Sequence, residues 1–315
     1  MIKCPLCEFQ VNNEDFKEKY ISDYNNIEYK LYYCQKCNCE WWEPLCIIPE
    51  FYEDEGESLY ELIHKGIRSL NDFNISFFKN FPLKKGRLLD VGCGDGIFLV
   101  HAERLGFEVW GIDFDKKSIK VAKERYKLKN VYNMSLEEFT NFAEREKIKF
   151  DIITFFEVLE HQDKPREFID NVKKLLNRDG YIAGTVPNRD CFFIRLYRGK
   201  LEKTDLPPHH FIRFSKRVIK SFLEDSGFSV EVSDTKTLSE IATLLELYLI
   251  GKYSFSFKKK LRETLYGSDK IAKKNFGHIL IKTLKNLRTF LFFPLSIFIF
   301  PFIEGAHIYF QGKLK

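Results

Sequence analysis

Three glycines at alternate positions separate a short apolar strand from a helical pattern in residues 87–100, which read RLLDVGCGDGIFLV. Glycine has no Cβ, so a glycine turn at this place lets backbone N–H groups approach a ligand closely. The G-x-G-x-G spacing differs from the G-x-G-x-x-G of dinucleotide-binding enzymes, and the Gly-Lys-Ser/Thr of a phosphate-binding loop does not follow it. Asp90 precedes the glycines, and its negative charge would repel a pyrophosphate but suits a cationic amino-acid group. The segment therefore predicts a binding turn for a positively charged ligand.

Strands and helices alternate along the central part of the chain. Strands are predicted over residues 88–91, 107–112, 130–134, 150–155, 180–186 and 228–232. Helices are predicted over residues 97–105, 116–126, 164–176 and 215–225, with another beginning at residue 135. This alternation predicts a parallel sheet with helices on both faces, and such sheets bind ligands at the carboxyl ends of their strands. Asp113 follows the second strand about twenty residues after the first glycine, where doubly wound folds place an acid that grips ribose hydroxyls.

The glycine turn, Asp113 and the alternating elements together resemble the class I S-adenosylmethionine-dependent methyltransferases. The resemblance covers about residues 85–235 and the last dozen residues. It implies an α/β fold with a Rossmann-like, doubly wound, seven-stranded sheet, in which residues 306–314 form an antiparallel last strand. It also implies an enzyme that uses S-adenosylmethionine as its co-substrate.

The resemblance assigns the cofactor contacts residue by residue. Asp90 and the turn from Gly92 to Gly94 would hold the methionine part, and Asp113 would hold the ribose hydroxyls. Ser135 and Leu136 would lie beside the adenine, and the pair after the fourth strand would close the floor near the sulfonium. The predicted cofactor-binding residues are Asp90, Gly92, Cys93, Gly94, Asp113, Phe114, Ser135, Leu136, Phe156 and Glu157.

Two Cys-x-x-Cys turns lie near the N-terminus, with 26 residues between them. Their four thiolates can bind one tetrahedral Zn²⁺, and four protein ligands leave no open position, which makes such a metal structural. The predicted ligands are Cys4, Cys7, Cys34 and Cys37. The intervening charged and aromatic residues predict a short hairpin. A redox dithiol is the alternative, and Cys39 could substitute as a ligand. The arrangement looks similar to zinc-ribbon-like knots that precede methyltransferase cores in bacterial enzymes acting on sugars and other small metabolites.

A hydroxyl acceptor needs help in losing its proton, and two segments could supply it. The first is the loop DLPPHHF of residues 205–211, in which His210 is preferred over His209 as a general base because histidine has a suitable pKa range. The alternative is a rigid loop whose histidines bond to the backbone. Arginines border this loop and could meet an acidic acceptor, although solvated arginines are commoner; they are Arg189, Arg195 and Arg213.

The second segment is EVLEH, where a helix start would place Glu157, Glu160 and His161 on one face. The pattern resembles that of the ubiquinone-pathway O-methyltransferases, and such ligands could hold Mg²⁺ against a diol-like acceptor. The interpretation favoured here is a metal-free helix with Glu157 near the cofactor and His161 hydrogen-bonded. The predicted catalytic residues are His210, His209 and His161.

The carboxyl-terminal third holds about seventy residues between the strand 228–232 and the last strand. It begins with a helical apolar run over residues 238–249, continues with a basic run over 258–288, and ends with the phenylalanine-rich run 290–302. This last run is too short and too broken by proline for a span of about twenty residues. It is expected either to form a lid that buries its phenylalanines over the acceptor pocket, which is preferred, or to dock at a membrane interface.

These patterns predict five segments. They are a zinc-ribbon-like knot over residues 1–48, a connecting helix over 49–84, the methyltransferase core over 85–235, a helical insertion over 236–303 and the final core strand over 304–315. Apolar residues at helical spacing mark the connecting helix within residues 57–79, which is expected to cover the cofactor.

The composition, with 44% hydrophobic and 30% charged residues, predicts a folded protein, and a net charge of +5 does not demand nucleic acid. The first residues, MIKCPLCEF, lack the apolar run of a signal peptide, and the cysteines suit a reducing compartment. A cytoplasmic location is expected, with a peripheral position at the inner membrane face as the alternative.

The predicted function is methyl transfer from S-adenosylmethionine to a small or lipid-linked metabolite, at a hydroxyl of a saccharide or quinone-like acceptor. One alternative is a zinc-knot nucleic-acid methyltransferase, against which the acceptor region lacks the Asn/Asp-Pro-Pro-Tyr/Phe motif of base-modifying amino methyltransferases. Another is a non-catalytic module that binds S-adenosylmethionine, against which the acids and glycines of the binding turn are intact. Transfer to nitrogen or carbon, and the oligomeric state, stay open.

Overall fold

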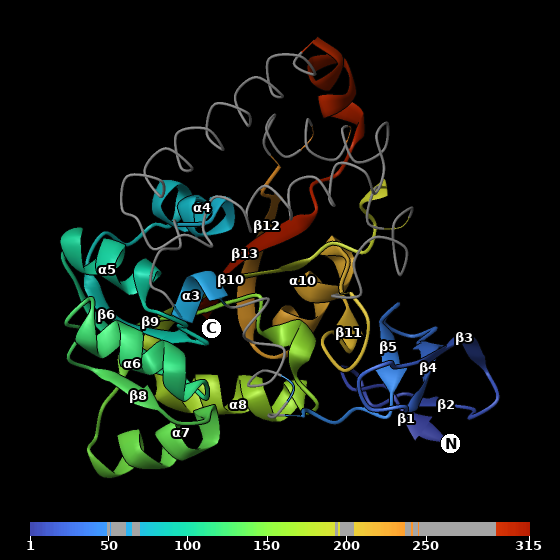
Figure 1. The fold of residues 1–315 in the computed structure, drawn as a ribbon, viewed down its shortest axis with the longest axis horizontal. Coiled ribbons are helices and arrows are strands. Elements are labelled where there is room, and N and C mark those ends of the chain that lie inside the picture. The colour runs from blue at the N-terminus through green and yellow to red at the C-terminus, as the bar shows by residue number, and fades with distance from the viewer. Residues whose placement is uncertain are drawn as a thin grey trace, which may run out of the picture. The chain divides into compact units, whose positions relative to one another are not determined.

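The computed structural model describes residues 1–48, 51, 61–64, 70–192, 195, 205–236, 241, 245 and 294–315. The chain divides into two compact units. The first comprises Met1–Arg189, Thr204–Thr235 and His307–Lys315, and the second comprises Asp190–Lys203 and Lys236–Ala306. The first unit therefore contains the predicted knot and the predicted final strand together with most of the core (Figure 1).

A seven-stranded sheet forms the centre of the first unit, in the order β12-β13-β10-β9-β6-β7-β8. Its strands are β6 (Gly86–Val91), β7 (Phe107–Asp113), β8 (Val131–Asn133), β9 (Phe150–Phe156), β10 (Leu176–Pro187), β12 (Phe228–Asp234) and β13 (His307–Leu314). Strand β6 pairs in parallel with both β7 and β9, and β13 runs antiparallel to β10 and β12. The predicted doubly wound sheet with an antiparallel last strand is confirmed.

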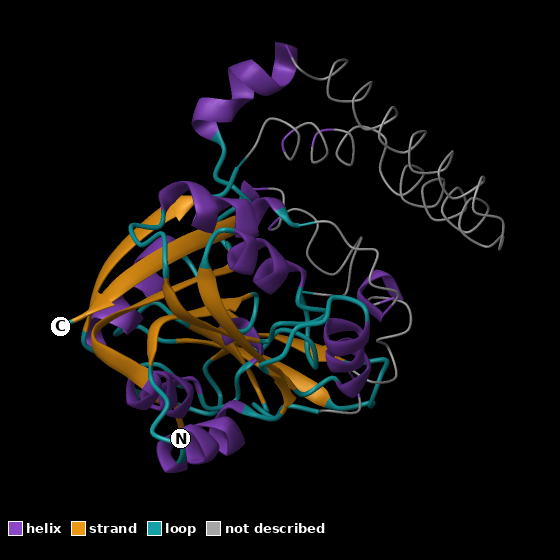
Figure 2. Ribbon diagram, turned by 90° about the vertical axis from the view of Figure 1, so that its left-hand side faces the viewer, coloured by secondary structure: helices purple, strands orange, loops and turns teal. Residues whose placement is uncertain are grey.

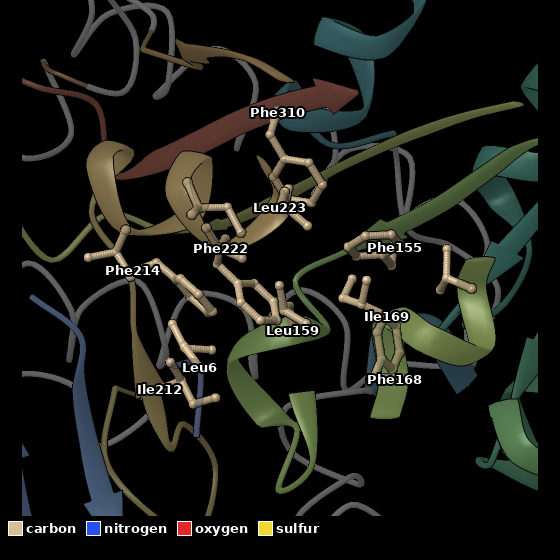
Figure 3. Close-up of a cluster of buried hydrophobic side chains, with 14 of the residues drawn as sticks. Leu6, Phe155, Leu159, Phe168, Ile169, Ile212, Phe214, Phe222, Leu223 and Phe310 are labelled. Carbon is tan, nitrogen blue, oxygen red and sulfur yellow. The ribbon is translucent and has the colours of Figure 1, made fainter. Parts of the chain in front are cut away.

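Helices cover both faces of this sheet because neighbouring strand residues point to opposite sides. Leu88 packs with α4 (Asp72–Asn80), α5 (Ile97–Arg104) and α6 (Lys116–Glu124) in one buried cluster. The adjacent Leu89 packs in a second cluster with α7 (Leu136–Arg145), α8 (Pro165–Leu175) and α10 (Lys216–Asp225). Figure 2 shows the helices around the twisted sheet. Figure 3 shows part of the second cluster, where Phe155, Phe222 and Phe310 meet.

Three helices begin at side-chain caps, as their sequences favour. The Asp115 carboxylate accepts a hydrogen bond from the Lys117 N–H at the start of α6, and the Ser215 hydroxyl accepts one from Val218 at the start of α10. Ser135 forms a capping box with Glu138 at the start of α7. These caps fix the chain direction just after strand ends, where ligands of such sheets bind.

Two local predictions differ from the structure. The connecting helix is interrupted, because Asn71 is extended (φ −78°, ψ 154°) between α3 (Glu61–His64) and α4. The EVLEH segment does not begin a helix at Glu157, because that residue has a left-handed φ of 55° and only Leu159–His161 form a 3₁₀ turn, η1. Glu157 and Glu160 therefore do not share a helical face.

The N-terminal knot, residues 1–48, forms two small sheets. Strands β1 (Ile2–Lys3) and β2 (Gln10–Val11) form a hairpin around the first cysteine pair. Strands β3 (Phe16–Ile21), β4 (Glu28–Tyr33) and β5 (Glu40–Glu43) form an antiparallel sheet, in which β3 and β4 are the predicted hairpin. A fourth strand, β11 (Ile212–Arg213), joins β5 from a distant part of the chain.

The described part of the second unit ends in a helical segment over residues 294–299 and the 3₁₀ turn η2 (Phe300–Phe302). Its small core contains Cys191, Ile241, Leu245 and Ala306. The predicted helical run 238–249, apart from residues 241 and 245, and the basic run 258–288 lie outside the described residues. Among the described residues, none of the helices combines the length and apolar character needed to cross a bilayer.

Candidate functional site

The glycine turn connects β6 to α5 in a backbone conformation that suits glycine. Gly92, Gly94 and Gly96 have φ values of 75°, 54° and 78°, a region that other residues rarely adopt. Space is also limited, since a Cβ on Gly92 would lie 2.6 Å from Val158 Cγ2. The N–H groups of Gly92 and Cys93 donate to the Ile112 carbonyl at 2.9 and 3.0 Å, which joins the turn to the end of β7.

Asp113 ends β7 with its carboxylate at the glycine turn. One oxygen accepts a hydrogen bond from the Gly94 N–H at 2.8 Å, and the other accepts one from the Asp115 N–H at 2.8 Å. The Asn133 side chain donates to the carbonyls of Asp113 and Phe114 at 3.0 and 2.7 Å. Asn133 was absent from the sequence-based site, although its position at the end of β8 was a usable signal. Asp113 therefore stands where three neighbouring strands end.

The other predicted cofactor residues lie at the same edge of the sheet. Asp90 is buried at 3% exposure, and its carboxylate accepts a hydrogen bond from the Thr154 hydroxyl at 2.6 Å. Ser135 and Leu136 follow β8, and Cys93 is buried within the turn. Phe156 ends β9, with its ring 4.8 Å from that of Phe98. The structure thus brings the ends of β6, β7, β8 and β9 together. After β6 the chain adds β7 and β8 on one side of that strand, and it then adds β9 on the other side.

Three histidines from two segments meet beside η1. His161, His209 and His210, called the histidine cluster below, each place one ring nitrogen within 4.8 Å of the other two. His161 Nδ1 lies 2.5 Å from the His209 carbonyl oxygen, to which it donates. His210 Nδ1 lies 3.5 Å from the Asp205 carboxylate. The three predicted catalytic residues are therefore neighbours, and the loop 205–211 packs on η1 through the Phe211 N–H and the Glu160 carbonyl at 2.9 Å.

Burial controls the charge of the groups around the histidine cluster. Burial and the neighbouring histidines lower the pKa of His161 and of His210 well below the ordinary value, so both rings are neutral at neutral pH. Glu160 is fully buried, and neither of its carboxyl oxygens has a hydrogen-bond partner among the described residues. Burial and the charge of Glu157 raise the pKa of Glu160 well above its usual range. A protonated Glu160 and neutral imidazoles are the state that this environment favours.

Glu157 faces a different partner. Its carboxylate lies 3.5 Å from Nε2 of His307, the first residue of β13, and burial raises the pKa of Glu157 despite this histidine. The Glu157 N–H donates to the Thr185 carbonyl at 2.9 Å. His307 was not predicted as a site residue, because its strand is separated by some 150 residues from Glu157 in sequence.

The three arginines that border the histidine loop have different surroundings. Arg213 is 5% exposed, and its guanidinium contacts the Glu40 carboxylate at 2.8 Å and the Asp205 carboxylate at 3.5 Å. Arg189 lies 3.9 Å from Glu40 as well. Arg195 is an exposed residue of the second unit. Arg213 is therefore a buried, paired arginine and not a solvated one, and its contact with an acidic acceptor stays a prediction.

The four predicted metal-ligating cysteines come together in the knot. Their Sγ atoms all lie within 4.8 Å of one another, and the closest pairs, Cys4–Cys37 and Cys7–Cys34, are 3.5 Å apart. The two turns have the same geometry, since Glu8 and Asn38 donate backbone hydrogen bonds to the carbonyls of Cys4 and Cys34 at 2.9 and 2.8 Å. A tetrahedral ion with Zn–S bonds of about 2.3 Å places sulfurs about 3.8 Å apart, which these spacings fit.

Comparison with known proteins identifies the class. Residues 63–232, more than half of the chain, match the family described as "Methyltransferase domain". The chain belongs to this family, and its seven-stranded sheet with an antiparallel last strand is that of the S-adenosylmethionine-dependent class I fold.

Two relatives and one solved structure are similar to this chain. A ubiquinone biosynthesis O-methyltransferase of Pelagibacter ubique is 35% identical over 148 residues, which cover 45% of this chain and 57% of the relative. The mitochondrial enzyme of that name from Schizosaccharomyces pombe is 31% identical over 185 residues, covering 56% and 66%. The chain thus spans less than two thirds of these relatives. A structure of phosphoethanolamine N-methyltransferase 2 from Haemonchus contortus with S-adenosylmethionine has a TM-score of 0.52 at 16% identity, covering 87% of this chain and 61% of that one; it bears on the fold alone.

Proposed function

We propose that this protein transfers a methyl group from S-adenosylmethionine to a hydroxyl group of a small or lipid-linked acceptor. The observation that carries the proposal is the meeting of Asp90, the glycine turn and Asp113 at one sheet edge, together with the histidine cluster that η1 and the loop 205–211 form. A bound S-adenosylmethionine supplies a methyl group on a positively charged sulfur, which needs alignment and exclusion of water more than covalent help.

Each end of the cofactor has residues that suit it. The Asp90 carboxylate and the turn backbone would hold the methionine part, and the remaining lone pairs of Asp113 would accept hydrogen bonds from the ribose hydroxyls. Ser135 and Leu136 would border the adenine, and Phe114, exposed at 47%, stands at the same edge. Phe156 and Glu157 would close the floor near the sulfur.

His210 is the proposed general base, with His209 and His161 as its neighbours. A base must be neutral before it can take a proton, and burial keeps the His210 ring neutral. Asp205 faces Nδ1 of His210, which favours the proton on that nitrogen and leaves Nε2 to accept the proton of the acceptor hydroxyl. His161, held through Nδ1 by the His209 carbonyl, would support the arrangement.

The acceptor class is inferred from the relatives. Both curated relatives are named for O-methylation in ubiquinone biosynthesis, which supports a hydroxyl on a quinone-like ring as the acceptor. A saccharide hydroxyl is the alternative. The nucleic-acid and non-catalytic alternatives gain no support from these comparisons.

A metal-assisted reaction is the competing mechanism. The Mg²⁺ site considered from sequence needs Glu157, Glu160 and His161 together, but Glu157 faces His307 instead. The ligand-like group in the structure is the histidine cluster, with Glu160 Oε1 3.8 Å from His161 and 3.9 Å from His210. Such nitrogen ligands suit a transition metal better than Mg²⁺. Removal of divalent metal by a chelator would stop turnover by this mechanism but not turnover by metal-free general-base catalysis.

The knot is proposed to hold one structural Zn²⁺ through Cys4, Cys7, Cys34 and Cys37. Cys39 is buried but lies outside the group whose sulfurs are mutually close, and Cys46 is exposed. Four thiolates leave no position for a substrate, so this ion would support the fold and not the chemistry.

The apolar end of the second unit supports docking at a membrane surface. Leu295, Ile297, Phe298 and Phe302 are exposed, the two phenylalanines by 75% and 87%. Basic residues of the 258–288 run, which precede them in sequence, would attract anionic lipid. Such docking suits a lipid-linked acceptor and a peripheral location at the cytoplasmic face, whereas a lid would bury these side chains.

Replacing Asp113 with alanine should weaken binding of S-adenosylmethionine. The change removes acceptors for two ribose hydroxyls, each charge-assisted bond contributing about 1.5–3 kcal/mol, and frees the Gly94 N–H. Calorimetry with S-adenosylhomocysteine measures the affinity, and thermal unfolding checks the fold. Glu108→Ala, an exposed change on the same strand, is the control. Equal affinity in Asp113→Ala and the wild type would contradict the cofactor assignment.

Metal analysis of the purified protein should find one Zn²⁺ per chain. Cys34→Ser should lose it, because a three-thiolate site is incomplete. Cys46→Ser, which changes an exposed cysteine outside the cluster, should retain it. Binding of S-adenosylhomocysteine should survive in both variants, since the cofactor residues belong to the other sheet. A folded wild type without metal would exclude the proposed site.

His210→Ala should reduce turnover by about 10²–10⁴-fold with little change in cofactor affinity, because only proton removal is affected. His101→Ala on α5 serves as the control, and the assay uses a catechol-type quinone precursor as the acceptor. Near-normal turnover by His210→Ala would contradict the general-base role and favour a purely structural role for the loop 205–211. Turnover that EDTA abolishes and an added divalent metal restores would establish the metal-assisted mechanism.

The protein should co-sediment with anionic liposomes, and binding should weaken as salt rises. Replacing Phe298 and Phe302 with serine should release it without lowering the melting temperature, since both side chains are exposed. Phe9→Ser, a change of an exposed phenylalanine in the knot, should leave liposome binding intact. If the wild type does not bind liposomes, the run 290–302 is better interpreted as a lid, and a soluble acceptor becomes the better hypothesis. A large loss of stability in the double variant would also favour the lid.

A further inference from the structure

The loop that carries His209 and His210 ends in the sheet of the N-terminal knot. Strand β11 pairs antiparallel with β5, so that Ile212 faces Trp41 and Arg213 faces Glu40. The Trp42 N–H donates to the Phe211 carbonyl at 2.9 Å, which extends the pairing toward the histidines. Figure 1 shows β11 beside β5 of the N-terminal sheet. The knot therefore holds the backbone of the histidine loop on one side, and the Glu160 carbonyl of η1 holds it on the other.

Side chains strengthen the same connection. The Tyr29 ring of β4 lies 6.3 Å from the Phe211 ring, and both residues are buried. Leu6, between the first two cysteines, packs in the same buried cluster as Ile212, as Figure 3 shows. The Phe51 ring, just beyond the knot, lies 5.7 Å from the His209 ring. The loop is thus packed against the knot on the side opposite η1.

A series of contacts between charged groups connects the knot to His210. Glu40 Oε2 accepts a hydrogen bond from Arg213 Nη1 at 2.8 Å, and Arg213 Nη2 donates to Asp205 Oδ2 at 3.5 Å. The other oxygen of Asp205 lies 3.5 Å from His210 Nδ1. Burial would raise the pKa of Glu40, but the Lys17 hydrogen bond and the charges of Arg213 and Arg189 hold it below its ordinary value. Glu40 is therefore an anion, and it forms the first contact of this series.

The Arg213 guanidinium can relate the position of Asp205 to that of Glu40, because it is buried and planar. A buried guanidinium is strongly destabilising unless it is paired, so Arg213 takes its place from the carboxylates on either side. Its rigid fork presents separate N–H groups to Glu40 and to Asp205, which a lysine could not do in the same geometry. The Asp205 carboxylate lies between the Arg213 guanidinium and Nδ1 of His210, so its position bears on which His210 nitrogen carries the proton.

We propose that Glu40 of the N-terminal knot is a positioning residue for the acceptor site, acting through Arg213 and Asp205 to fix the ring of His210 with its proton on Nδ1. The knot then supplies part of the acceptor site and is more than a stabilising appendage. This inference rests on the proposed role of His210 in methyl transfer. Other groups that face His210 are Glu160, at 3.9 Å from Nε2, and the rings of His161 and His209.

The test reads the His210 ring directly, in full-length protein labelled with ¹⁵N in its histidine rings. Long-range ¹H–¹⁵N spectra distinguish the two neutral tautomers, and His210→Gln identifies the His210 signals. In the wild type the Nδ1–H form should dominate. Glu40→Gln should shift these signals toward the mixed or Nε2–H form and lower kcat by about 10- to 100-fold, with the affinity for S-adenosylhomocysteine unchanged.

Lys17→Met is the matched control. Lys17 contacts the other oxygen of the same Glu40 carboxylate at 2.8 Å from the exposed side, so its loss leaves the Arg213 contact in place. The His210 signals and kcat should stay at wild-type values in this variant. A change in Lys17→Met as large as that in Glu40→Gln would overturn the proposal, because it would show a general effect of disturbing the knot.

Two further variants keep the test decisive if Glu40→Gln does not fold. Arg213→Lys retains the charge but loses the fork, and Asp205→Asn removes the carboxylate next to His210; both should move the His210 signals. Unchanged signals in a folded Glu40→Gln or Arg213→Lys would overturn the inference, even if turnover fell. If His210→Ala turns over normally, the general-base proposal fails, whereas the ring spectra still decide whether Glu40 positions His210.

Discussion

The hydrogen bonds of the Asp113 carboxylate hold the glycine turn and the end of β7 together. One oxygen binds the Gly94 N–H of the turn after β6, and the other binds the Asp115 N–H at the start of α6. Asp115 in turn caps α6 and contacts the His64 Nε2 of α3 at 2.6 Å. An anion at this point compensates several N–H groups that a strand end and a helix start would otherwise leave unpaired. The same residue that is proposed to select ribose is thus needed for the shape of the turn.

The histidine cluster depends on the opposite effect, which is the removal of charge. Glu160 is buried without a hydrogen-bond partner among the described residues, and the pKa values of its half-buried neighbours His161 and His210 are lowered so far that both rings are neutral. A buried polar group of this kind destabilises a fold, typically by about 1–3 kcal/mol. Such unfavourable groups gather at functional sites more often than elsewhere, because a reaction requires groups that the fold alone would not retain.

The sequence predicted the elements whose patterns are local. The glycine turn, the helix start at Ser135 and the period of the strands each depend on a few neighbouring residues, so the core sheet could be derived in advance. The position of His307 beside Glu157 could not, since β13 is placed by pairing with distant strands. The left-handed backbone conformation of Glu157 was not predicted, because glutamate is not a residue type that indicates this conformation. Strand β11 has only two residues, too few for a period, and Arg213 looked like a solvated arginine until its partner Glu40 was known.

The place of β13 has a consequence for how the chain assembles during synthesis. This strand comes from the last residues, yet it lies between β10 and β12, which precede it in the chain. While the ribosome is still making the insertion, β10 has an open edge and β12 has no partner in the sheet. Exposed strand edges are sites of mispairing between chains. The growing protein therefore stays vulnerable to aggregation until β13 has been made, although the parallel strands on the other side of the sheet can form long before.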